Sequence, residues 1–325
     1  MDKNKIISET KAIIYIILSV LLIKVTVLEA YIVPTGSMEN TIMTGDFLIG
    51  SRFVYGMRTP DWLGIPYTDI GFFIPYFKFP PFKIPKTGDV LIFKYPRDIY
   101  VKYVKRCVAS PGDTVEIRKK DLFVNGIEIP MWENGKFLSQ PMDRDLKQPD
   151  IFLNSDVNTN RDNLGPIYIP KIGDVFPIHH ETNWRYLLPI ILMEGHSASL
   201  ENNGVVYNFT LQDPNEIFRR KGKEKVFEEY FPYGGNLINP WSDAIHNDHF
   251  KYLKIDGKPI NEINSYVVKQ NYYWAMGDNR DDSLDSRYWG FVPENNILGE
   301  AIFAYFSLNL NSWIPRFERI GRLIE

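Results

Sequence analysis

The sequence predicts a mainly β protein that a single helix near its N-terminus anchors in a membrane. Aromatic residues make up 14% of the 325 residues, and 22 prolines and 22 glycines punctuate the chain, which favours strands and turns over a helix bundle. Only one apolar segment is long enough for a membrane-spanning helix. The net charge of −3 and the lack of a long basic run argue against nucleic acid as a partner.

The apolar segment follows a polar stretch, residues 1–11, that carries three lysines. It is almost wholly apolar from Ala12 to Ile23 and continues with interruptions to Val33. Residues 12–33 as a helix would span about 33 Å, enough for the hydrocarbon core of a bilayer. The lysines ahead of the segment predict a cytoplasmic N-terminus. A cleavable signal peptide and a buried core helix are the alternatives, but small residues are poorly spaced for cleavage, and we expect an uncleaved signal-anchor.

The rest of the chain alternates turn signals with short apolar strands. The pattern predicts an antiparallel meander, hairpins at Asn125-Gly126 and Asp256-Gly257, and a helix that begins at Asp213-Pro214 and ends near Tyr230. The expected strands are residues 47–49, 90–95, 100–108, 114–117, 271–276 and 288–293.

Two further segments have an unusual composition. Residues 55–87 form a proline-rich aromatic loop, which either packs on the core or dips into the lipid headgroups. Residues 311–325 interleave apolar residues with Arg316, Arg319 and Arg322, a pattern typical of an amphipathic, membrane-proximal tail.

Three local patterns carry candidate chemistry. Ser37 directly follows the apolar segment, although small-residue turns that contain serine are common connectors. Lys105 and Arg106 are adjacent in an expected strand, so one of them must face the packed side unless both are solvated at a sheet edge. Residues 277–287 are dense in Asp, Asn, Ser and Arg. This run is either a solvated turn or an internally paired network, and the aromatic strands around it favour the network.

Metal and redox chemistry have little support in the sequence. Four of the five histidines form the pairs His179/His180 and His246/His249, with no further ligand at a spacing suited to zinc. The single cysteine, Cys107, excludes an intramolecular disulfide. We expect no metal and no cofactor.

Four stretches in this order resemble the bacterial type I signal peptidases, which remove signal sequences from exported proteins. They are residues 34–38 with 45–46, residues 88–94, residues 103–106 with 111–113, and residues 277–283 with 285–287. The self-cleaving SOS repressors share the chemistry and core fold but carry a DNA-binding domain in place of the membrane segment. A membrane-tethered β-rich binding module is the non-enzymatic alternative.

The resemblance implies a serine endopeptidase with Ser37 as nucleophile, a neutral Lys105 as general base and an acyl-enzyme intermediate. Ser283 would orient the lysine, and the Ser37 backbone N–H with the Thr35 hydroxyl would form the oxyanion hole. The shallow pockets that accept alanine would be lined by Tyr31, Met38, Ile42 and Val104. A salt-linked structural network would comprise Arg106, Asp278, Arg280, Asp285 and Arg287.

The resemblance also implies the domain organisation and the partners. Residues 34–117 and 266–310 would form a signal-peptidase-type antiparallel β-sheet core, and residues 118–265 a large β-rich insertion. The substrates would be exported preproteins, cut after small-x-small sites such as Ala-x-Ala. The enzyme would be a monomer that passes once through the bacterial inner membrane, with its catalytic domain on the extracytoplasmic side.

Overall fold

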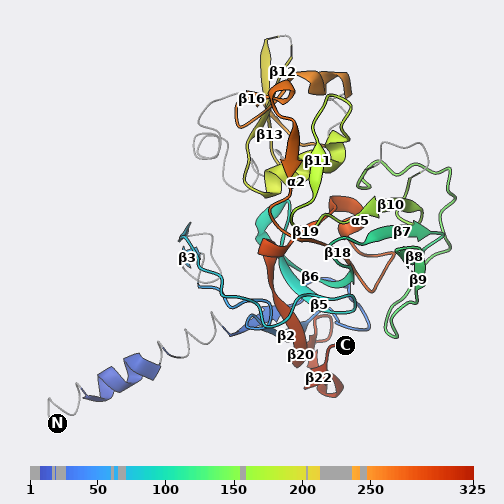
Figure 1. The fold of residues 1–325 in the computed structure, drawn as a ribbon. Coiled ribbons are helices and arrows are strands. Elements are labelled where there is room, and N and C mark those ends of the chain that lie inside the picture. The colour runs from blue at the N-terminus through green and yellow to red at the C-terminus, as the bar shows by residue number, and fades with distance from the viewer. Residues whose placement is uncertain are drawn as a thin grey trace.

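The computed structural model describes residues 8–16, 19, 27–59, 62–64, 71–153, 159–202, 204–212, 236–241 and 247–325. A nine-stranded antiparallel sheet lies at the centre of these residues, with the main strand order β1-β2-β20-β5-β6-β18-β19 and with β21 and β22 paired to β20 (Figure 1). Its strands are β1 (Leu28–Ile32), β2 (Asp46–Ser51), β5 (Val90–Tyr95), β6 (Asp98–Ala109), β18 (Tyr272–Met276), β19 (Val292–Pro293), β20 (Ile297–Asn309), β21 (Ile314–Pro315) and β22 (Arg322–Leu323). The prediction of a mainly β protein is confirmed.

The N-terminal segment differs from its prediction. Residues 8–16 and 19 are helical, whereas residues 17, 18 and 20–26 lie outside the described part of the chain. No helix among the described residues is long and apolar enough to cross a membrane. The expected helix over 12–33 is wrong at its C-terminal end, because Leu28–Ile32 is strand β1, antiparallel to β2. Exposed and half-buried residues alternate along β1, which is the period of a strand.

Two further sheets extend the molecule away from the central one (Figure 1). The first has the order β10-β7-β8-β9, and the second the order β14-β13-β12-β15-β16. The first comprises β7 (Thr114–Arg118), β8 (Asp121–Val124), β9 (Ile127–Ile129) and β10 (Leu164–Tyr168). The second comprises β12 (Ala198–Asn202), β13 (Val205–Phe209), β14 (Asn236–Ile238), β15 (Leu253–Ile255) and β16 (Lys258–Pro259). Both hairpins that the Asn-Gly and Asp-Gly pairs predict are confirmed as β8–β9 and β15–β16.

Shorter elements connect these sheets. Two strand pairs are β3 (Trp62–Gly64) with β4 (Gly71–Phe73) and β11 (Val175–Pro177) with β17 (Ser265–Val267). The 3-10 helices are η1 (Asn247–Tyr252), η2 (Ile260–Glu262), η3 (Glu294–Asn296) and η4 (Phe317–Arg319). Helix α2 (Trp184–Met193), whose N-terminus Asn183 caps, was not predicted. The helix expected over 213–230 lies outside the described residues.

The strand expected over 288–293 is wrong for most of its length. Residues Ser286–Trp289 form helix α5, and the side chain of Asp285 caps it by accepting a hydrogen bond from the Arg287 N–H. Gly290, at φ +87°, ends the helix, and a Cβ there would also lie 2.6 Å from the ring of Phe152. Only Val292–Pro293 remains extended, as β19.

The largest hydrophobic core runs through both the central sheet and the other two. Val108 on β6 and Trp274 on β18 belong to the same buried cluster as Val115, Leu187 and Leu200. The boundary expected at residue 117 falls inside strand β7, which pairs with β8 and β10. Residues 118–265 therefore share a core with the central sheet.

The C-terminal tail is folded onto the central sheet. Strands β21 and β22 pair with β20, and Arg319 makes a buried ion pair with Asp46 at 2.5 Å. Other side chains of the tail are exposed, including Trp313 at 74% and Phe317 at 73%. The tail is thus an edge of the sheet that presents apolar side chains outward.

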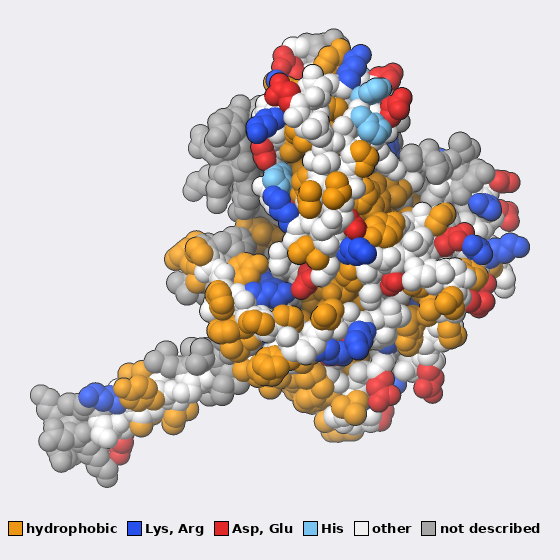
Figure 2. Space-filling model, in the orientation of Figure 1, with side chains coloured by type: hydrophobic (Ala, Val, Ile, Leu, Met, Phe, Trp, Pro, Cys, Tyr) orange, Lys and Arg blue, Asp and Glu red, His pale blue; other side chains and the backbone are white. Residues whose placement is uncertain are grey.

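The proline-rich loop packs on the core at its base and exposes aromatic side chains elsewhere, whereas contact with lipid headgroups stays a prediction. Arg58 is buried and donates to the backbone carbonyls of Asn295 and Ile297, which fixes the base of the loop on the core. Phe77 and Phe82 are 60% and 72% exposed. Hydrophobic side chains gather over the lower part of the molecule in Figure 2, on the side from which the N-terminal segment extends.

Candidate active site

Ser37 and Lys105 lie in direct contact, although 68 residues separate them. The Lys105 Nζ is 2.6 Å from the Ser37 Oγ and 2.9 Å from the carbonyl oxygen of Val104. Ser37 lies in the turn between β1 and β2, and Lys105 comes from the middle of β6. Both side chains are buried, with residue exposures of 8% and 2%. The structure therefore brings together the two residues that the resemblance assigns to the chemical step.

The environment of Lys105 increases the neutral fraction of its amine. Burial lowers its pKa from 10.5 to about 8, because the charged form loses its hydration. The carboxylates of Asp285 and Asp278 act in the opposite direction and keep the pKa from falling further. A neutral amine at hydrogen-bond distance from a hydroxyl can accept its proton, which is the first requirement for a general base.

The loop 277–287 holds the Ser37 turn in place. The Asn279 N–H donates to the Ser37 carbonyl at 3.1 Å, and the Asn279 side chain donates to the Gly36 carbonyl at 3.1 Å. Gly277 packs so closely that a Cβ there would lie 2.4 Å from the Ser37 carbonyl oxygen and 2.2 Å from the Ser283 Oγ. Glycine is required at this position because any side chain would displace the turn that carries Ser37.

A buried ion pair supports the other face of β6. Arg106 binds Asp278 through Nε at 2.8 Å and Nη2 at 2.7 Å, and Thr41 donates its hydroxyl proton to Asp278 at 2.6 Å. Neither Lys105 nor Arg106 is solvated, since Arg106 is 1% exposed. The two adjacent residues therefore serve two internal sites, one on each side of the strand.

Two more charges of the loop form a second buried pair. Arg287 donates to Asp285 through Nε and Nη2, each at 2.9 Å, and to the Arg280 carbonyl at 2.5 Å. The Gly277 N–H also donates to Asp285, at 3.1 Å. Arg280 is buried, and its guanidinium lies 6.0 Å from the ring centre of Trp132. The paired network that the composition of this loop favours is therefore present for Arg106–Asp278 and Arg287–Asp285, whereas Arg280 makes no ion pair with a described residue.

Ser283 lies beside the site without a hydrogen bond of good geometry to any described residue. Its hydroxyl is buried, and it packs against Gly277. It is near enough to Asp285 to contribute to the lowered pKa of that carboxyl, whose larger influences are burial, which raises the pKa, and Arg287, which lowers it. Its hydroxyl makes no hydrogen bond with Lys105, so an orienting role for Ser283 stays a prediction.

The two expected oxyanion donors have free hydrogen-bonding capacity. Thr35 is exposed beside Ser37, and its hydroxyl makes no hydrogen bond within the described part of the chain. The Ser37 N–H likewise has no acceptor there, while the Ser37 carbonyl is held by Asn279. Both donors are thus available to a ligand.

The four expected pocket residues belong to one apolar cluster. Met38 and Ile42 are fully buried within it, and Tyr31 and Val104 pack against its edge. The cluster connects the Ser37 turn with strands β1, β5, β6 and β20.

Two ion pairs that the sequence analysis missed join residues 118–140 to the site. Lys120 is 5% exposed, and its Nζ donates to both carboxylate oxygens of Asp281, at 2.7 and 2.8 Å. Lys136 donates at 2.6 Å to Glu39, which lies two residues after Ser37. The Lys136 backbone N–H donates to the Asp278 carbonyl, and the Lys136 carbonyl accepts from the Arg280 N–H. No local signal marks these residues, because each pairing depends on the chain folding back over a distant loop.

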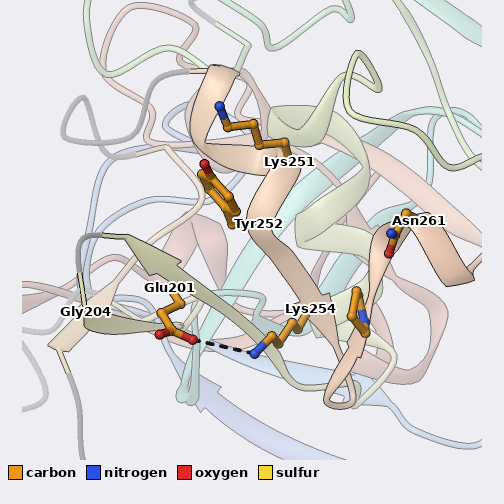
Figure 3. A pocket seen from close by; sticks show the side chains of 7 residues that line it. Glu201, Gly204, Lys251, Tyr252, Lys254 and Asn261 are labelled. Atoms are coloured by element: carbon orange, nitrogen blue, oxygen red, sulfur yellow. Dashed lines mark ion pairs between the residues drawn. The ribbon is translucent and has the colours of Figure 1, made fainter.

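An open pocket of about 530 Å³ lies elsewhere, against the β12–β16 sheet (Figure 3). Its charged lining includes the Glu201–Lys254 ion pair at 3.7 Å, and it contains none of the predicted site residues. Among the residues that the structure describes, no group of three or more His, Cys, Asp or Glu side chains is arranged to hold a metal ion.

Comparison with known proteins gives a consistent result. Residues 6–306 match the model of the family described as signal peptidase, peptidase S26. The signal peptidase I of Buchnera aphidicola subsp. Schizaphis graminum is 27% identical over 98% of this chain and 85% of its own length. That of Aquifex aeolicus is 27% identical over 92% of this chain and 84% of its own. A crystal structure of a signal peptidase I from Enterococcus faecalis is 18% identical, covers 67% of this chain and 97% of its own, and superposes with a TM-score of 0.25. The chain belongs to the signal peptidase family, peptidase S26, and is a serine hydrolase.

Proposed function

We propose that this protein is a membrane-bound signal peptidase I that cleaves exported preproteins with Ser37 as nucleophile and neutral Lys105 as base. The observation that carries the proposal is the buried contact of 2.6 Å between the Ser37 hydroxyl and the Lys105 amine. A hydroxyl is unreactive at neutral pH without a base, and a lysine serves as one only when burial lowers its pKa.

The reaction proceeds in two steps. The Ser37 Oγ attacks the carbonyl carbon of the scissile peptide while its proton moves to the Lys105 Nζ. The tetrahedral oxyanion accepts hydrogen bonds from the Ser37 N–H and the Thr35 hydroxyl. The C–N bond then breaks, the new amino terminus takes the proton from Lys105, and the signal peptide stays esterified to Ser37. Water, deprotonated by Lys105, hydrolyses this ester and restores the enzyme.

The strands beside the site can take an extended substrate. Among the described strands, β1 pairs only with β2, and β6 before Arg106 pairs only with β5. Each strand thus has a free backbone edge next to Ser37 or Lys105, to which an extended peptide can add as a further strand. The apolar cluster of Tyr31, Met38, Ile42 and Val104 would receive small side chains at the −1 and −3 positions.

Membrane attachment rests on the sequence and on the exposed apolar surface. A signal-anchor that ends before Leu28 would leave β1 and Ser37 immediately outside the bilayer, at the depth where a signal peptide presents its cleavage site. Exposed Phe82, Trp313 and Phe317 fit a surface in contact with lipid headgroups. The N-terminus would be cytoplasmic and the folded part extracytoplasmic, as a monomer without a cofactor.

Cleavage of a preprotein by the detergent-solubilised enzyme tests the proposal. A substrate whose signal ends in Ala-x-Ala is expected to be cut after the second alanine, with loss of activity in Ser37→Ala and in Lys105→Ala. The exposed residues Ser265 and Lys119 provide matched controls, because Ser265→Ala and Lys119→Gln remove the same groups away from the site. Full activity in either site variant would refute the mechanism.

A further inference from the structure

One ion pair bridges the two strands that flank the site. Strands β1 and β6 are separated by β2, β20 and β5 in the sheet, yet the Lys102 Nζ on β6 lies 2.9 Å from the Glu29 carboxylate on β1. The same ammonium lies 5.3 Å from the ring centre of Tyr31. The sheet therefore curls until β1 and β6 face each other. Lys102 lies three residues before Lys105 on β6. Glu29, on β1, lies eight residues before Ser37.

Lys102 is the weakly held member of this bridge. Its side chain is 41% exposed, whereas that of Glu29 is 19% exposed. Glu29 has two other donors, Arg52 at 2.9 Å and the Tyr31 hydroxyl at 2.5 Å, and the Arg52 side chain is only 9% exposed. If Lys102 turns away, Glu29 remains neutralised and hydrogen-bonded. Lys102 can therefore leave Glu29 for a substrate group without stranding a buried charge.

The position of Lys102 fixes which part of a substrate it meets. Three residues of extended chain span about 10 Å, so a peptide lying along β6 with its scissile carbonyl at Ser37 has its −4 or −5 residue beside Lys102. This step rests on the function proposed above. A substrate chain that runs from the membrane towards Ser37 approaches from this side, because the enzyme's own chain enters the sheet at Leu28, next to Glu29.

We propose that Lys102 is a specificity-determining residue that selects preproteins by the charge of the residue four or five positions before the scissile bond. An acidic side chain there replaces Glu29 as the partner of Lys102 and is favoured. A basic side chain meets the ammonium of Lys102 and is disfavoured, while an uncharged one is intermediate. Arg52 stays with Glu29 in each case.

The test uses the full chain in detergent with three sets of Ala-x-Ala peptides, identical except for Asp, Gln or Lys at position −4 or −5. For the wild-type enzyme we expect kcat/KM to fall from Asp to Gln to Lys, with about a 3- to 10-fold difference between the extremes. Lys102→Gln is expected to remove this preference and Lys102→Glu to reverse it, with each rate expressed relative to that of the Gln peptide for the same enzyme. Lys119→Gln, which removes an exposed lysine elsewhere, keeps the wild-type preference.

One further variant guards against an uninformative result. Lys102→Arg retains the charge and is expected to retain the preference. A wild-type enzyme that does not distinguish the peptides, or a preference that survives in Lys102→Gln, would overturn the proposal. If the wild-type enzyme cuts none of the peptides, including the Gln series, the proposed function itself fails. If it cuts all three equally, only the role of Lys102 is lost.

Discussion

The pH dependence of cleavage follows from the burial of Lys105. A pKa of about 8, compared with 10.5 for a free lysine side chain, raises the neutral fraction at pH 7 from about one in 3,000 to about one in ten. The lowered pKa of Lys105 therefore increases the concentration of the neutral, active base at pH 7 about 300-fold. The net shift corresponds to about 3 kcal/mol against the ammonium form, which is the lost hydration after Asp285 and Asp278 have offset part of it.

The assay is kcat/KM for an Ala-x-Ala peptide measured between pH 5.5 and 10.5. Because the neutral amine is the active form, activity is expected to rise about tenfold per pH unit in the acidic range and to level off above about pH 8. The Lys119→Gln control is expected to give the same curve. A rate that still rises tenfold per unit between pH 9 and 10 would mean that Lys105 has an ordinary pKa, and a flat rate from pH 6 would contradict a base with a pKa of about 8.

Three other predictions test the surroundings of the site. Lys105→Met should be inactive but more stable at pH 7, by up to about 3 kcal/mol in denaturant unfolding. The pKa of Lys105 is lower in the native state than in the unfolded state, so the stability of the wild type rises between pH 8 and 10.5. The stability difference between Lys105→Met and the wild type should shrink over this range. An equal difference at pH 7 and at pH 10.5 would count against this. Arg106→Met strands the buried Asp278 carboxylate and should cost about 3–5 kcal/mol, whereas an unchanged unfolding midpoint would mean that the pair is solvated. Thr35→Val should lower kcat about 100- to 1,000-fold while Thr35→Ser retains it, and a change in KM alone would assign Thr35 to binding.

Much of the site was predictable because its parts lie in short, distinctive runs. The resemblance to the type I signal peptidases assigned Ser37 and Lys105, the loop 277–287 stands out in composition, and the alternation of a strand predicted that Lys105 and Arg106 point to different faces. Which groups meet could not be read from the sequence. Asp278 is 172 residues from Arg106, and many acidic residues in the chain could have been its partner.

The misread segments share a different cause. Residues 28–32 continue an apolar run, so their summed hydropathy extends the expected helix, although their alternation and the partner strand β2 make them a strand. Arg319 looks like the polar side of an amphipathic segment until Asp46, 273 residues away, supplies a buried partner. The loop 277–287 likewise receives Lys120 from a turn that reads as an ordinary hairpin. Tertiary pairing decided each of these cases, and local pattern carries no information about it.

The mechanism depends most on the contact between Ser37 and Lys105. Its most direct test is the trapping of the acyl-enzyme: rapid acid quench of the wild-type protein with a preprotein, followed by intact-mass analysis and peptide mapping. The mechanism predicts a signal-peptide ester on Ser37 that is absent from Ser37→Ala and Lys105→Ala and present in Ser265→Ala and Lys119→Gln. Cleavage at the wild-type rate by Lys105→Ala, or an ester on a serine other than Ser37, would contradict it.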